Sequence, residues 1–116
     1  MNIYYHRTDA AEAILLEGFR DNNGLVGAYS ADIEGVFLSD IPLDCNTGAK
    51  GKQLLEVRLP IGCDISYYEI VEEDAEGKPY REWCVPAALI NRHGQIRMVS
   101  DEEEEELYRR LMGWTE

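Results

Sequence analysis

The chain has few cysteines, few basic residues and no long apolar segment. Its three cysteines, Cys45, Cys63 and Cys84, are odd in number and form no C-x-x-C pair, which argues against a disulfide framework and against a clustered zinc site. No apolar run approaches the roughly 18 residues that span a bilayer, and no basic segment followed by an apolar one opens the chain. We therefore expect a cytoplasmic protein with no metal site and no membrane partner.

Acidic residues dominate the charge. The 11 Lys and Arg residues stand against 23 Asp and Glu, which gives a net charge of −12. Surfaces that bind duplex nucleic acid are positive, so this balance favours a protein or a small molecule as partner. Six of the acids form the run Asp101 to Glu106, which is typical of a solvated helix face.

The pattern of short apolar segments predicts one α+β domain over residues 1–116. A run of helix formers that stops at Gly18 predicts a first helix, and a second is expected at about 101–112. Leu107, Tyr108, Leu111 and Met112 are expected to dock that second helix on the body, with its acids exposed. Strands or extended segments are expected at 2–6, 36–39, 53–59, 64–71, 80–85 and 95–100.

Three short segments far apart in the chain each place a reactive or positioning side chain in a predicted strand. They are Tyr4-Tyr5-His6-Arg7-Thr8, Gly35-Val36-Phe37-Leu38-Ser39-Asp40 and Tyr80-Arg81-Glu82-Trp83-Cys84-Val85-Pro86. An imidazole, an aromatic ring and a carboxylate that converge from three strands are suited to holding a ribose. They are also suited to stabilising positive charge at its anomeric carbon, which is glycosyl-transfer chemistry.

In this order, His6 to Thr8, Gly35 to Asp40 and Glu82 to Val85 resemble the ADP-ribosyltransferases of the His-Tyr-Glu kind. That group includes the poly(ADP-ribose) polymerases and the diphtheria-toxin-like enzymes. The resemblance extends from about Ile3 to Val99. It implies a minimal single-domain ADP-ribosyltransferase-like fold, with two small antiparallel sheets around an NAD cleft, and NAD as the co-substrate.

The resemblance assigns NAD contacts to the first two segments. It implies that His6 bonds a ribose hydroxyl, that Thr8 holds the nicotinamide amide, and that Phe37 takes the place of a Tyr that stacks on nicotinamide. Arg7 replaces a common Gly, and its main chain can make the same amide contact. Read as ordinary structure, His6 is a strand-end histidine, Thr8 a helix cap and Phe37 a core aromatic.

Glu82 is the expected catalytic residue, with His6 beside it. Strands disfavour Glu, and the matching Glu of the family bonds the nicotinamide ribose and stabilises the oxocarbenium-like transition state. The alternative for Glu82 is a surface position on an edge strand. Ser39 and Asp40 are expected to line the pocket or to form a turn. The candidates for the NAD pyrophosphate are Arg20, Arg58 and Arg81.

The activity that the resemblance implies is transfer of a single ADP-ribose unit to an unidentified acceptor. Tyr80 stands two residues before Glu82, where arginine-specific members have Glu or Gln, so arginine is disfavoured as the acceptor. Three alternatives stay open. They are NAD hydrolysis, an inactive NAD- or ADP-ribose-binding module, which Arg7 and Phe37 favour, and removal of a 2′-phosphate from RNA, which the acidic composition disfavours.

Overall fold

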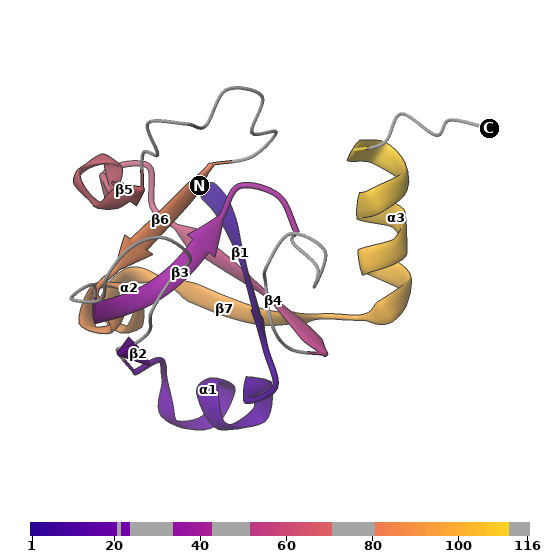
Figure 1. Ribbon diagram of the computed structural model, residues 1–116, viewed down its shortest axis with the longest axis horizontal. Coiled ribbons are helices and arrows are strands. Elements are labelled where there is room, and N and C mark those ends of the chain that lie inside the picture. The colour runs from indigo at the N-terminus through magenta and orange to yellow at the C-terminus, as the bar shows by residue number, and fades with distance from the viewer. Residues whose placement is uncertain (21, 24–33, 43–51, 71–80, 112–116) are drawn as a thin grey trace.

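Short antiparallel strands and three helices make up the part of the chain that the computed structural model describes, residues 1–20, 22–23, 34–42, 52–70 and 81–111 (Figure 1). The strands are β1 (Asn2–Thr8), β2 (Asn22–Asn23), β3 (Glu34–Ser39), β4 (Gln53–Leu59), β5 (Glu69–Ile70), β6 (Glu82–Val85) and β7 (Gln95–Val99). The helices are α1 (Ala11–Glu17), α2 (Ala87–His93) and α3 (Asp101–Leu111), with a 3₁₀ turn at Ser66–Tyr68.

The strands form one antiparallel sheet in the order β5-β6-β3-β1-β4-β7, and β2 pairs with β3 beside this path. Every residue of β1 has a partner on β4, but β1 and β3 meet at the single pair Tyr5 and Ser39. The α+β class is confirmed. The sheet count differs from the expected two, because this one pair joins the two halves into a continuous sheet.

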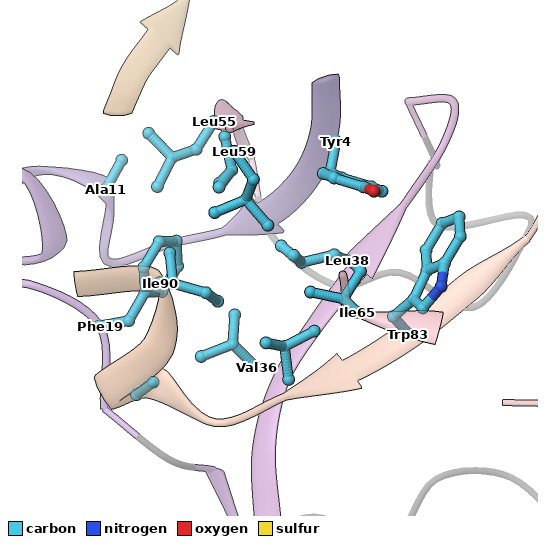
Figure 2. Close-up of a cluster of buried hydrophobic side chains, with 13 residues drawn as sticks. Tyr4, Ala11, Phe19, Val36, Leu38, Leu55, Leu59, Ile65, Trp83 and Ile90 are labelled. Atoms are coloured by element: carbon cyan, nitrogen blue, oxygen red, sulfur yellow. The ribbon is translucent and has the colours of Figure 1, made fainter. Parts of the chain in front are cut away.

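One face of the sheet is apolar and packs under α1 and α2; we call it the core face. Alternate residues of a strand point to the same side, so Tyr4, Leu55 and Val57 share this face with Val36 and Leu38 of β3. Figure 2 shows Ala11, Phe19 and Ile90 at one end of this core and Tyr4 and Trp83 at the other. Burial of each such large side chain contributes about 1.5–3 kcal/mol to the stability of the fold.

The helix predictions succeed at both ends of the chain and fail in between. Helix α1 ends at Gly18, whose φ of 88° is a conformation that glycine adopts freely, and α3 starts at Asp101 as expected. The sequence pattern predicts only a short connection between the strands at 80–85 and 95–100, whereas Ala87 to His93 form α2. No helix among the described residues has the length and apolar character needed to cross a membrane.

Candidate functional site

A cleft opens where β1 and β3 part. Beyond the pair Tyr5 and Ser39, the end of β1 continues beside β4 while the start of β3 continues beside β6. Between them lies a cavity of about 340 Å³, closed on a third side by α1 and the residues that follow it. We call this space the β1–β3 cleft. Four residues with expected NAD contacts line it: His6, Thr8, Arg20 and Phe37.

His6 crosses the cleft and ties the two strands together. Its Nδ1 lies 2.8 Å from the main-chain oxygen of Phe37, and its ring meets the ring of Phe19 edge-on at 5.2 Å between centroids. Because a carbonyl oxygen only accepts, Nδ1 carries the proton, and Nε2 is the acceptor of the neutral ring. Burial lowers the pKa of His6, and the bond to Phe37 offsets this only in part, so the ring is neutral at pH 7.

Phe19 is held in place by a side chain of α2. Asn91 accepts from the Phe19 N–H at 2.7 Å and donates from Nδ2 to the Phe19 oxygen at 2.8 Å. Gly18 makes room for this contact, since a Cβ there would lie 2.9 Å from Asn91 Oδ1. Sequence reasoning assigned no functional role to Phe19 or Asn91. The available signal was an aromatic residue directly after a helix-ending glycine.

The remaining cleft residues form its rim. Thr8 Oγ1 accepts from the Ala10 N–H at 2.9 Å, which places the hydroxyl at the turn into α1. Arg20 is exposed and lies 3.5 Å from the Glu17 carboxylate, so its guanidinium is at the mouth of the cleft. Phe37 is half-buried and borders the cavity from β3, but it alternates with Val36 and Leu38 of the core face, so its ring lies on the same side of the sheet as Ser39.

Glu82 lies on the other side of the sheet from His6. Ser39 is the partner of both Tyr5 and Glu82, so these three residues share a face, and His6, next to Tyr5, belongs to the core face. The buried Ser39 hydroxyl donates to the Ile41 oxygen at 2.6 Å and is 3.4 Å from the Tyr5 oxygen. Neither Glu82 nor Ser39 lines the cavity among its described residues.

Arg7 also points away from the cleft. It follows His6 on β1, and its guanidinium forms an ion pair with Glu104 of α3 and lies 3.1 Å from the Tyr108 hydroxyl. The expectation that the acids of this last helix would all be exposed is therefore wrong for Glu104, of which 19% of the side chain is accessible. The sequence gives no sign of this contact, because Arg7 and Glu104 are 97 positions apart.

Arg81 lies at the far edge of the sheet. Its Nε donates to Glu69 at 2.9 Å, and its guanidinium stacks 5.0 Å from the centre of the Trp83 ring. Asp40 Oδ1 accepts from the Arg81 N–H at 2.9 Å, which is consistent with the expected alternative of a turn role for Asp40. Arg58, the third pyrophosphate candidate, pairs with Glu56 on β4. Tyr80 and Cys45 fall outside the described residues.

No protein-family model, curated protein or solved structure matches this chain. Within the described ranges, no three His, Cys, Asp or Glu side chains gather in a way that would hold a metal ion. Function is therefore inferred from the β1–β3 cleft itself.

Proposed function

We propose that the protein binds NAD in the β1–β3 cleft and transfers its ADP-ribose unit to an acceptor. One observation supports this most: strands that meet at a single pair leave a cavity that gathers His6, Thr8, Phe37 and Arg20. Ligand pockets span roughly 300–1,000 Å³. A cavity of about 340 Å³ fits the nicotinamide ribose half of NAD, with the adenosine half extending beyond the mouth.

Each cleft residue has a chemical role that suits this ligand. The neutral His6 ring offers Nε2 as an acceptor for a ribose hydroxyl, because Nδ1 is bonded to Phe37. The hydroxyl of Thr8 is suited to holding the carboxamide, and Phe37 borders the cavity from β3. Arg20 at the mouth is suited to pairing with the pyrophosphate.

In this proposal Glu82 is the group that stabilises positive charge on the ribose as nicotinamide leaves. A fixed carboxylate beside developing positive charge lowers the barrier to that departure. This role requires Glu82, which lies on the face opposite His6 and does not border the cavity, to come within reach of the bound ribose. Transfer to water instead of an acceptor makes the same site an NAD hydrolase.

A second candidate is an NAD- or ADP-ribose-binding module without turnover. The observation that favours it is the placement of His6 and Glu82 on opposite faces of the sheet. The two candidates share the cleft and differ in whether Glu82 acts on the bound ligand.

Binding is tested by filling the cleft. Ala13 lines the cavity from α1 and has an exposed side chain, so Ala13→Trp places an indole in the cavity without disturbing the core. Leu16→Trp is the matched control, because Leu16 lies on the same helix, is 84% exposed and is not part of the cavity lining. Calorimetric titration should show NAD affinity reduced at least about tenfold by Ala13→Trp and unchanged by Leu16→Trp. Equal affinities in the two variants, or no NAD binding by the parent, would remove the cleft from consideration.

Turnover is tested by measuring nicotinamide release with Glu82→Gln. Loss of one preorganised electrostatic contact lowers kcat by about 100- to 1,000-fold, and NAD affinity should stay near that of the parent. NAD binding by the parent without nicotinamide release would establish the binding module. An unchanged rate in the variant would show that Glu82 has no part in the reaction.

A further inference from the structure

Three arginines share the face of the sheet that lies opposite the core face. Tyr5 pairs with Glu56, and Glu56 pairs with Arg97, so these residues point to the same side. By the same alternation Arg7 and Arg58 belong to this side as well. We call Arg7, Arg58 and Arg97 the arginine face. It contrasts with a chain whose net charge is −12.

Glu56 organises the arginine face from within. It is 4% exposed and forms ion pairs with both Arg58 and Arg97. Burial acts to raise the pKa of Glu56, but the hydrogen bonds from Arg58 and Arg97 outweigh it and hold the pKa below its ordinary value. The carboxylate is therefore ionised and keeps two guanidiniums in fixed positions. The three arginines and Glu56 together carry a charge of about +2.

Helix α3 covers the arginine face with acids of its own. Glu104 pairs with Arg7, and Glu103 pairs with Arg97 at 2.9 Å. Only 8% of the Arg7 side chain is exposed beneath this cover. The carboxylates of Glu104 and Glu103 therefore occupy the positions beside Arg7 and Arg97 that any other bound anion would have to take.

The cover is ionic and loosely packed. A second cavity of about 340 Å³ lies between α3 and the sheet. Tyr5, Glu56 and Arg97 border it from the sheet, and Glu102, Glu103, Glu106, Leu107 and Arg110 border it from α3. Leu107 and Tyr108 are only half-buried, and the pair of Arg97 with Glu103 is 49% and 46% exposed, so salt screens it. Figure 1 shows α3 beyond the end of β7, on the opposite side of the molecule from α2. A helix held in this way is displaceable by a ligand that binds the same arginines.

We propose that the arginine face is a binding site for phosphate groups of a phosphoanhydride, and that α3 is a built-in competitor for it. Guanidinium pairs phosphate oxygens as it pairs carboxylate oxygens, so a pyrophosphate group competes with Glu103 for Arg97 and with Glu104 for Arg7. The pyrophosphate comes either from a nucleotide such as ADP-ribose or from a free anion. The site stands on the far face from the β1–β3 cleft, so this inference is independent of NAD binding there.

The test compares two double variants of the full chain. Glu103→Gln with Glu104→Gln removes the carboxylates that touch the arginine face. Asp101→Asn with Glu105→Gln is the matched control, because both are exposed acids of α3 that do not border this cavity, and Glu105 pairs with Arg109 within the helix. Both variants change the net charge equally. Calorimetric titration uses inorganic pyrophosphate and ADP-ribose at low salt, after circular dichroism has shown the parent helix content in each variant.

We expect pyrophosphate to bind the first variant at least tenfold more tightly than the parent, and the control within about twofold of the parent. Removing the guanidinium with Arg7→Ala in the first variant should abolish the gain. A gain for ADP-ribose alone would show that the source is a nucleotide. An equal increase in pyrophosphate affinity in both double variants, or no increase in either, would contradict the proposal that α3 competes with an anion for the arginine face. The Ala13→Trp change added to the first variant should leave pyrophosphate binding intact, which separates this site from the cleft.

Discussion

Protonation of His6 should destabilise the fold as the pH falls, and the size of the effect follows from its burial. The imidazole sits between the Phe37 carbonyl and the Phe19 ring, and burial lowers its pKa from the ordinary value of 6.5. The unfolded chain then binds a proton on this residue before the folded chain does. The contribution of the neutral His6 ring to stability is therefore fully present above about pH 7.5. It is lost as the pH falls through 6.5 towards the pKa of His6 in the folded protein.

The magnitude is bounded by the linkage relation. Each pH unit between the unfolded and folded pKa costs about 1.4 kcal/mol, so the loss from His6 at pH 5.5 is at most about 1.4 kcal/mol. Glu56 does not interfere, because its pKa is lowered from 4.5 and its contribution is lost only at lower pH. The windows of the two groups are separate.

The assay is a set of urea melts of the parent and of His6→Gln at about pH 7.5, 6.5 and 5.5. Gln keeps a donor for the Phe37 carbonyl but does not titrate. The free energy of unfolding of the parent should fall with pH by up to about 1.4 kcal/mol more than that of the variant. The same pH dependence in both proteins would refute the assignment of a buried neutral imidazole.

Three further predictions concern stability, each measured by thermal or urea melts. Gly18→Ala should cost about 1–3 kcal/mol, because φ is 88° and the new Cβ meets Asn91, whereas Gly62→Ala, with nothing within 4 Å, should cost less than about 1 kcal/mol. Leu55→Ala should cost about 2–5 kcal/mol and Leu107→Ala about 1 kcal/mol, because Leu55 is fully buried and Leu107 half-buried. Glu105→Gln with Glu106→Gln, which neutralises two exposed acids of α3, should change stability by no more than about 0.5 kcal/mol. A loss of more than about 1 kcal/mol for Gly62→Ala would contradict the reasoning on the glycines. Equal losses for the two leucine variants would contradict the difference in their burial, and a large loss for the glutamate pair would contradict its exposed position.

The sequence predicted most of the longer strands because their signal is local, whereas the expected extended segment 64–71 contains the 3₁₀ turn Ser66–Tyr68 and only the short strand β5. Runs of β-branched and aromatic residues mark β1, β3, β4 and β7, and the stop at Gly18 comes from a conformation that glycine favours. Helix α2 escaped prediction because seven residues between Pro86 and Gly94 resemble a connection. It forms because Ala87 and Ile90 pack on the sheet, which is information from the tertiary structure.

The same distinction applies to the candidate site. The order of the three segments was readable, and the structure brings His6, Thr8 and Phe37 to one cavity. The face on which each side chain lies depends on strand register, and a shift of one residue exchanges the two faces. The placement of Glu82 away from His6 was therefore not predictable, and neither was the pairing of Arg7 with an acid near the other end of the chain.

The most direct test of the account is a crystal structure of the protein with NAD or a non-hydrolysable analogue. We expect nicotinamide between β1 and β3 and its ribose within hydrogen-bond distance of His6 Nε2. We also expect the pyrophosphate near Arg20 at the mouth of the cleft. Nicotinamide bound anywhere else, or a cleft without ligand at saturating NAD, would contradict this expectation.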